Sequence, residues 1–132
     1  MRSDKSRGFS EVKYPLSVLM FTFAVIVWAG DFEDGVAAYD RKDYTTALIK
    51  FKSAAEQGHV SSQANIGVMY YRGEGVPQDF LRAQMWFNLA AAGGEANAIK
   101  NRDIGSARMT VKQLRRAQRM AKRCKARNYK RC

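Results

Sequence analysis

The chain has 132 residues, which suits one domain and leaves little room for a second. Apolar residues make up 46% of the chain, enough for a packed core, which argues against global disorder. One histidine and two cysteines exclude a conventional multi-ligand zinc site and a dense disulfide scaffold, and the presence of only two prolines favours helices.

The positive charge is concentrated at one end of the chain. The formal net charge is +11, from 23 basic and 12 acidic residues. Residues 108–132 hold 11 basic residues and no acidic one, whereas residues 1–107 hold 12 of each. We therefore expect the C-terminal segment, and not the body of the domain, to face an anionic partner.

The first 29 residues have the pattern of an export signal. Basic residues dominate residues 1–14, and an apolar run follows from Leu16 to Trp28, shorter than a helix that spans a bilayer. Val27 and Ala29 suit a signal peptidase, so we expect cleavage before Gly30 and a periplasmic or secreted protein. An uncleaved membrane anchor formed by residues 15–29, or a buried core helix, is the alternative.

An internal repeat organises the rest of the chain. Residues 43–51 and 79–87 match at an offset of 36 residues, with an acid, an aromatic residue, alanine and phenylalanine at the same places. A period of this length is typical of helical solenoids. Asp43 and Asp79 are expected N-caps, and a further helix precedes each unit, at residues 32–40 and 62–72.

Residues 64–79 carry a resemblance to a known family. This stretch contains the loop Gly73-Glu74-Gly75-Val76, is followed by Trp86-Phe87 and Ala90-Ala91, and closely resembles the Sel1-like repeat, a relative of the tetratricopeptide repeat. The resemblance covers residues 35 to about 107 and implies an all-α fold: a short right-handed α/α solenoid of helix pairs. Exported bacterial members have a similar C-terminal repeat, and the family is associated with assembling protein complexes. The first unit departs from the pattern in its short turn, and residues 95–107 lack the loop.

Residues 110–127 are expected to form a helix that caps the solenoid. Thr110 and Gln113 have the spacing of a capping box, in which each side chain accepts a hydrogen bond from the backbone of the other residue. Residues 111, 114, 117, 121 and 124 form a narrow apolar stripe. The domain organisation is thus a signal over residues 1–29, repeats over 30–109, and a basic capping helix and tail over 110–132.

Cys124 and Cys132 lie eight residues apart. On a continuous helix this separation is roughly 12 Å, beyond the reach of a disulfide. A bridge requires the helix to end near Arg127 and the tail to fold back. A disulfide and free or intermolecular thiols are both open at this point.

The sequence offers no catalytic constellation. His59 follows a helix-ending glycine and has no nucleophile or orienting acid placed beside it by sequence. Gly73 and Gly75 lack the third glycine and the preceding strand of a phosphate-binding loop. We expect a protein that is not an enzyme, with no cofactor, no metal and no small-molecule substrate.

Two partner surfaces are candidates. The first is the inner surface of the solenoid, where amides and arginines could hold a peptide of a protein partner, and an ordinary solvated helix face is the alternative. Its candidate residues are Ser62, Asn65, Met69, Arg72, Asn101 and Arg108. The second is the basic helix, which could contact acidic lipid or cell-wall polymer, or nucleic acid if the protein is not exported. Its candidate residues are Lys112, Arg115, Arg116, Arg119, Lys122 and Arg123.

Overall fold

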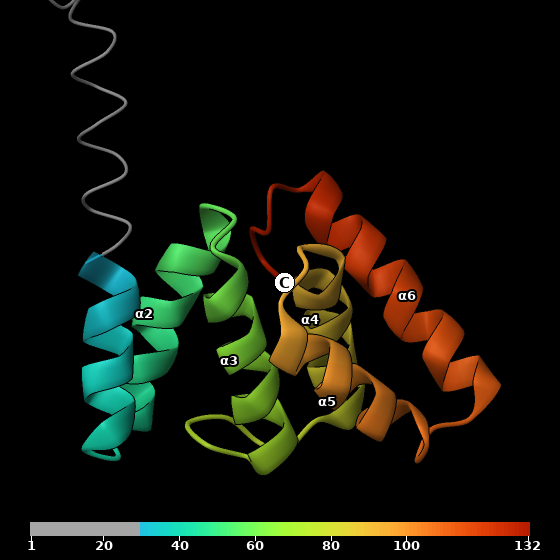
Figure 1. The fold of residues 1–132 in the computed structure, drawn as a ribbon, viewed down its shortest axis with the longest axis horizontal. Helices are drawn as coiled ribbons and strands as arrows, with labels where there is room; N and C mark the ends of the chain where they lie inside the picture. Colours follow the sequence, from blue (N-terminus) through green and yellow to red (C-terminus); the bar gives the residue numbers. More distant parts are fainter. Residues whose placement is uncertain (1–29) are drawn as a thin grey trace, which may run out of the picture.

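The structure is a computed structural model that describes residues 30–132, and within this range every regular element is a helix. The first helical stretch covers residues 30–40. Five helices follow, α2 Tyr44–Glu56, α3 Val60–Arg72, α4 Phe80–Ala92, α5 Ala96–Ser106 and α6 Val111–Ala126. Helices α2, α3 and α4 stack in chain order, and α5 and α6 both pack on α4, with α6 at the C-terminal end of the stack (Figure 1). The all-α solenoid is confirmed.

The helices begin where the sequence offers side-chain acceptors for free backbone N–H groups. The carboxylates of Asp43 and Asp79 accept from the N–H of Thr46 at 3.2 Å and of Arg82 at 3.0 Å, as predicted. Thr110 and Gln113 form the predicted capping box of α6. His59 is the N-cap of α3, a role that the sequence did not predict.

The repeat produces the same packing twice. Gly35 and Gly67 each receive a phenylalanine ring, from Phe51 and Phe87 respectively. A Cβ at either glycine would lie 2.7 or 2.6 Å from ring carbons, so these positions hold glycine because the ring rests on the helix backbone. Both rings are buried, at 1% and 3% exposure. The core is therefore built from equivalent ring-on-glycine contacts in successive units.

The Gly-x-Gly loop ties the second unit to the first. The hydroxyl of Tyr39 donates a 2.6 Å hydrogen bond to Glu74 and accepts a 3.1 Å one from Arg72. Gly75 has a φ of +73°, and a Cβ there would lie 2.8 Å from the carbonyl oxygen of Tyr44. Only glycine meets both requirements, so the loop can close on the start of α2.

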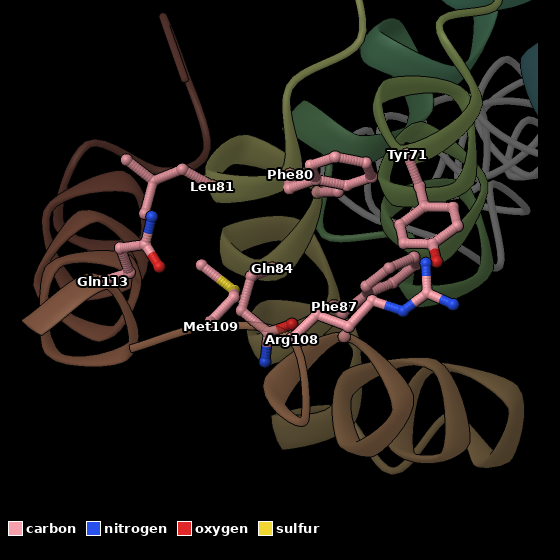
Figure 2. Close-up of a pocket in the computed structure, with 10 residues that line it drawn as sticks. Tyr71, Phe80, Leu81, Gln84, Phe87, Arg108, Met109 and Gln113 are labelled. Atoms are coloured by element: carbon pink, nitrogen blue, oxygen red, sulfur yellow. The ribbon is translucent and has the colours of Figure 1, made fainter. Parts of the chain in front are cut away.

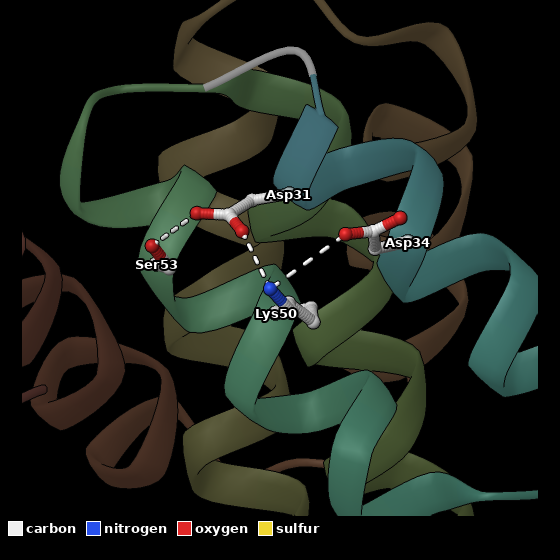
Figure 3. Close-up of polar contacts among 4 residues, drawn as sticks. All are labelled: Asp31, Asp34, Lys50 and Ser53. Atoms are coloured by element: carbon white, nitrogen blue, oxygen red, sulfur yellow. Dashed lines mark hydrogen bonds and ion pairs between the residues drawn. The ribbon is translucent and has the colours of Figure 1, made fainter. Parts of the chain in front are cut away.

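The first described turn is fastened to α2 by polar contacts (Figure 3). The ammonium of Lys50 lies 3.0 Å from Asp31 and 3.6 Å from Asp34, and Ser53 donates a 2.5 Å hydrogen bond to Asp31. The Ser53 hydrogen bond, followed by the Lys50 contact, holds the pKa of Asp31 below its usual range. These contacts thus hold the start of the first described helix against α2.

Helix α6 caps the stack by packing on α4. Ala117, Ala121 and Cys124 are buried, as the apolar stripe predicts. Val111 is 64% exposed, so the stripe does not reach the start of the helix.

Within residues 30–132, no helix is both long and apolar enough to cross a bilayer. The predicted signal or anchor over residues 1–29, including Val27 and Ala29, lies outside the described residues.

Candidate functional site

The predicted stripe on α3 is wrong at two of its four positions. Ser62 and Met69 are both completely buried. The backbone N–H of Ser62 donates to Nδ1 of His59, and its hydroxyl lies 2.8 Å from the same atom. Helix α3 packs against α2 on one side and α4 on the other, so two of its faces are covered. The predicted stripe avoids only one packed face of α3, so two of its residues lie on the second packed face and are buried.

The remaining members separate into those that line a depression and one that does not. Arg72 and Asn101 line the same hollow of about 200 Å³, although they come from α3 and α5. Its apolar lining residues are Val68, Tyr71, Phe87 and Ile104. Asn65 is half-buried on α3 and is not part of this lining.

Arg108 lines an adjoining cavity of about 180 Å³, which shares Tyr71 and Phe87 with the first hollow. Its side chain extends toward the ring of Tyr71 (Figure 2). The other labelled residues that surround the cavity are Phe80, Leu81, Gln84, Met109 and Gln113. We call the two hollows together the Tyr71 groove. It runs over α3, α4 and α5 and reaches the start of α6.

A buried glutamine and a glycine set the floor of the groove. Gln84 is 3% exposed, and its side-chain amide donates a 3.1 Å hydrogen bond to the carbonyl of Arg102. A Cβ at Gly105 would lie 2.5 Å from the Gln84 side-chain oxygen, so glycine allows α5 to approach α4. Sequence reasoning missed both residues, because a polar residue in an amphipathic helix is normally assigned to solvent.

The groove carries two arginines in different electrostatic settings. Arg72 is held by Tyr39 and lies 3.9 Å from Glu74. Burial, followed by the hydrogen bond to Glu74, raises the pKa of Tyr39 above its ordinary value of 10.0, which keeps this hydroxyl protonated. Arg108 is exposed and has no ion pair within the described part of the chain. Arg108 is therefore the cation that is open to an incoming carboxylate.

The lining of the groove is mainly apolar, with amide and guanidinium groups. The residues that line it include no serine, threonine, cysteine, histidine, aspartate or glutamate. Over residues 30–132, no group of three or more potential metal ligands comes together. His59 lies elsewhere, against the ring of Phe32, and burial lowers its pKa. The groove instead offers apolar walls with amide and guanidinium groups at the edge, which suits recognition of a peptide.

The six predicted contact residues of the basic helix are all exposed. Every basic residue from Arg108 to Arg131 is likewise exposed, and none of them forms an ion pair with another described residue. Arg115, Arg119 and Lys122 line a shallow depression next to Asn88 of α4. Their contact with an anionic surface stays a prediction.

A disulfide joins Cys124 to Cys132, with Cα atoms 5.5 Å apart. Helix α6 ends at Ala126, and the tail folds back so that Tyr129 and Cys132 pack against the core. The structure thus selects the disulfide from the two alternatives that the sequence left open.

Comparisons with known proteins agree with this architecture. The model of the Sel1 repeat matches twice, at residues 32–59 and 60–95. The chain is also similar to the crystal structure of c5321, described as a protective antigen present in uropathogenic Escherichia coli strains that displays an SLR fold. The TM-score is 0.72 at 31% sequence identity, and the match covers 77% of this chain. The match spans only 23% of the antigen's chain.

A comparison with curated proteins found no match. The two matched repeats, the all-α stack and the likeness to a solved SLR fold lead to one assignment: residues 32–95 of this chain are two Sel1 repeats.

Proposed function

We propose that this protein is a non-enzymatic scaffold that holds a segment of a partner protein in the Tyr71 groove. The Sel1-repeat fold supports a protein-interaction role in general. The observation that carries the finer proposal is the continuity of two hollows around Tyr71 and Phe87, edged by Arg72, Asn101 and Arg108.

The chemistry of the groove suggests how the segment is held. Side chains of Tyr71, Phe80 and Met109 offer apolar surface for an apolar residue of the segment. The Asn101 amide can both donate to and accept from a peptide backbone. Arg108, which has no described ion pair, can bind a carboxylate through two parallel hydrogen bonds in a bidentate arrangement.

The test compares an arginine that lines the groove with one that does not. The Arg108→Ala variant should lose the partner that co-purifies with the full chain from its own host. The Arg116→Ala variant loses the same charge from an exposed residue of α6 that does not line the groove. It should retain the partner. Equal loss in both variants, with both proteins folded by circular dichroism, would assign the effect to charge and remove the groove from the proposal.

The proposal includes export, because the partner must share a compartment with the scaffold. The basic start, the apolar run from Leu16 to Trp28 and the small residues Val27 and Ala29 support a cleaved signal. N-terminal sequencing of protein from an envelope fraction should begin at or near Gly30. A protein that retains Met1 in the cytoplasm would contradict export.

A second function is favoured by the basic C-terminal segment. Its eleven basic residues are exposed and have no ion pair with another described residue, so their charge is available to a partner. In a bacterial envelope, acidic lipid head groups are one such partner, and each nearby basic residue contributes about 1 kcal/mol to the attraction. The second proposal is weak, salt-sensitive binding of α6 to an anionic membrane surface.

Deleting residues 108–132 cannot separate the two functions, because Arg108, Met109 and Gln113 line the Tyr71 groove. Charge reversal at exposed residues of α6 that do not line the groove can separate them. The double variant Lys112→Glu, Arg116→Glu should lose most sedimentation with anionic vesicles. The control, Lys42→Glu with Lys100→Glu, makes the same charge change on exposed residues of the body and should keep it. Equal binding of the native chain to neutral and anionic vesicles would contradict this function.

A further inference from the structure

A second cavity lies between the repeat helices and the C-terminal tail, apart from the Tyr71 groove. It has a volume of about 350 Å³ and is lined from α2, α3, α4 and the last residues of the chain. Two aromatic residues form its inner wall, Tyr70 at 4% exposure and Trp86 at 2%. Tyr129 of the tail contributes a third ring. The cavity shares no lining residue with the groove, so it is an independent site.

The charge around this cavity is predominantly positive. Lys52, Arg82 and Arg131 line it, against the single acid Glu56. Arg82 lies over the ring of Tyr70, 5.7 Å from the centroid, and pairs weakly with Asp79 at 3.8 Å. Lys52, Arg131 and Glu56 form no ion pair within the described part of the chain. The positive excess among these lining side chains favours a ligand with negative charge.

Unused hydrogen-bonding groups belong to the same aromatic wall. The indole N–H of Trp86 is buried and donates to no atom of the described residues. The hydroxyl of Tyr70 is not among the buried unpaired atoms, so unlike the indole nitrogen it is accessible from outside. Buried polar groups are normally paired, and an unpaired one in a cavity lining is a reason to look for a ligand.

The cavity is completed by the disulfide. Arg131, Cys132 and Tyr129 reach it only because the tail turns back after α6 to the Cys124 cross-link. Asn128, Tyr129 and Arg131 have φ values of 53°, 61° and 55°, in the left-handed region that L-residues rarely adopt. In Figure 1 the tail returns from the end of α6 toward the stack. The cross-link and the packing of Tyr129 therefore hold a conformation that a free tail would not keep.

We propose that this cavity binds a carboxylate that is attached to an aromatic or apolar group. The cations would hold the carboxylate, and the rings of Tyr70, Trp86 and Tyr129 would pack against the apolar part. Glu56 disfavours a dianion such as a phosphate monoester, which is the reason for assigning a monoanion. A free organic acid and the C-terminal residue of a peptide share this chemistry.

The test uses Trp86 as its own reporter. Trp28 and Trp86 are the two tryptophans of the chain, so the full-length Trp28→Phe variant leaves one indole, in the cavity wall. We would titrate it with 3-phenylpropionate and with acetyl-Ala-Phe carrying a free C-terminus, and follow fluorescence and the indole N–H chemical shift. The corresponding amides are the neutral controls. We expect saturable changes in both signals, with at least one acid binding at least tenfold more tightly than its amide. The acid that binds more tightly shows whether the natural ligand is a free organic acid or the C-terminus of a peptide.

Matched variants locate the binding. Arg131→Gln should lower the affinity for the acid at least fivefold. Arg127→Gln, at an exposed tail residue outside the cavity, should change this affinity less than twofold. Cys132→Ser should weaken binding at least as much as Arg131→Gln, with helical content unchanged by circular dichroism. Equal affinity for acids and amides, equal effects of the two arginine variants, tighter binding of phenyl phosphate, or no change in either signal would overturn the proposal. None of these outcomes depends on the Tyr71 groove.

Discussion

Replacing Phe87 by alanine tests whether ring-on-glycine packing holds the repeats together. The ring is 3% exposed and rests on the backbone of α3 at Gly67, so the variant leaves a cavity between α3 and α4. Truncating a buried phenylalanine to alanine costs about 3–5 kcal/mol. A domain of this size has a total stability of about 5–15 kcal/mol, so the loss is a large share of it.

Phe80 provides a matched control on the same helix. It is 47% exposed, and its main described aromatic contact is with Tyr71 at a centroid distance of 5.2 Å. Such a pair contributes about 0.5–1.5 kcal/mol, so Phe80→Ala should cost about 1 kcal/mol. Urea unfolding followed by circular dichroism at 222 nm gives both values. Equal losses at the two positions would refute the packing argument.

Replacing Gly67 by alanine should have opposite effects on stability in the native chain and in the Phe87→Ala variant. In the native chain a Cβ at Gly67 would lie 2.6 Å from ring carbons of Phe87, and overpacking of this kind costs about 1–3 kcal/mol. With Phe87 already replaced by alanine, the Cβ has room, and alanine in a helix is then favoured over glycine by about 1 kcal/mol. Gly67→Ala should therefore destabilise the native chain and stabilise the Phe87→Ala variant. The same sign in both backgrounds would contradict the contact.

Three further predictions concern the tail, the cap of α3 and the loop. Cys132→Ser should lower the unfolding free energy by about 2–3 kcal/mol because it opens a short loop, and a thiol assay on the native chain should detect no free thiol before reduction. Burial lowers the pKa of His59 below its ordinary value of 6.5, so its contribution to stability is present above pH 6.5 and is lost as pH falls through the lowered pKa. Urea titrations between pH 7.5 and 5 should show this loss in the native chain and not in His59→Asn, which keeps an N-cap side chain. Tyr39→Phe should lower stability by about 1 kcal/mol in thermal unfolding, because it removes the hydrogen bond to Glu74, and an unchanged melting temperature would contradict the tether.

The repeat was predictable from sequence because its residues recur with their partners. Tyr39 meets Tyr44 at 5.2 Å and 64°, and Tyr71 meets Phe80 at 5.2 Å and 66°. These pairs occupy matching places in the two units, so the same geometry forms twice although the longer second loop separates its partners by more residues. The helix caps at aspartate and threonine were equally predictable from the sequence, because a cap depends on residues within one turn.

The binding surface was less predictable because it depends on contacts between helices. Ser62 and Met69 fit an exposed stripe only if α3 has one covered face, whereas a middle helix of a stack has two. Arg72 and Asn101 become neighbours through the packing of α5 on α4, which no local pattern encodes. Gln84 is polar yet buried, since its partner is a carbonyl 18 residues further along the chain.

Site-specific photo-crosslinking tests the central claim most directly. Benzoylphenylalanine would replace Phe80, which is 47% exposed and lines the Tyr71 groove, and in a separate protein Ile49, which is 63% exposed on α2 and does not. Irradiation of the full chain in its own host should give one discrete crosslinked protein from position 80, lost in the Arg108→Ala background, and none from position 49. The same crosslinked protein from both positions, or undiminished crosslinking in that background, would contradict a scaffold that binds its partner in this groove.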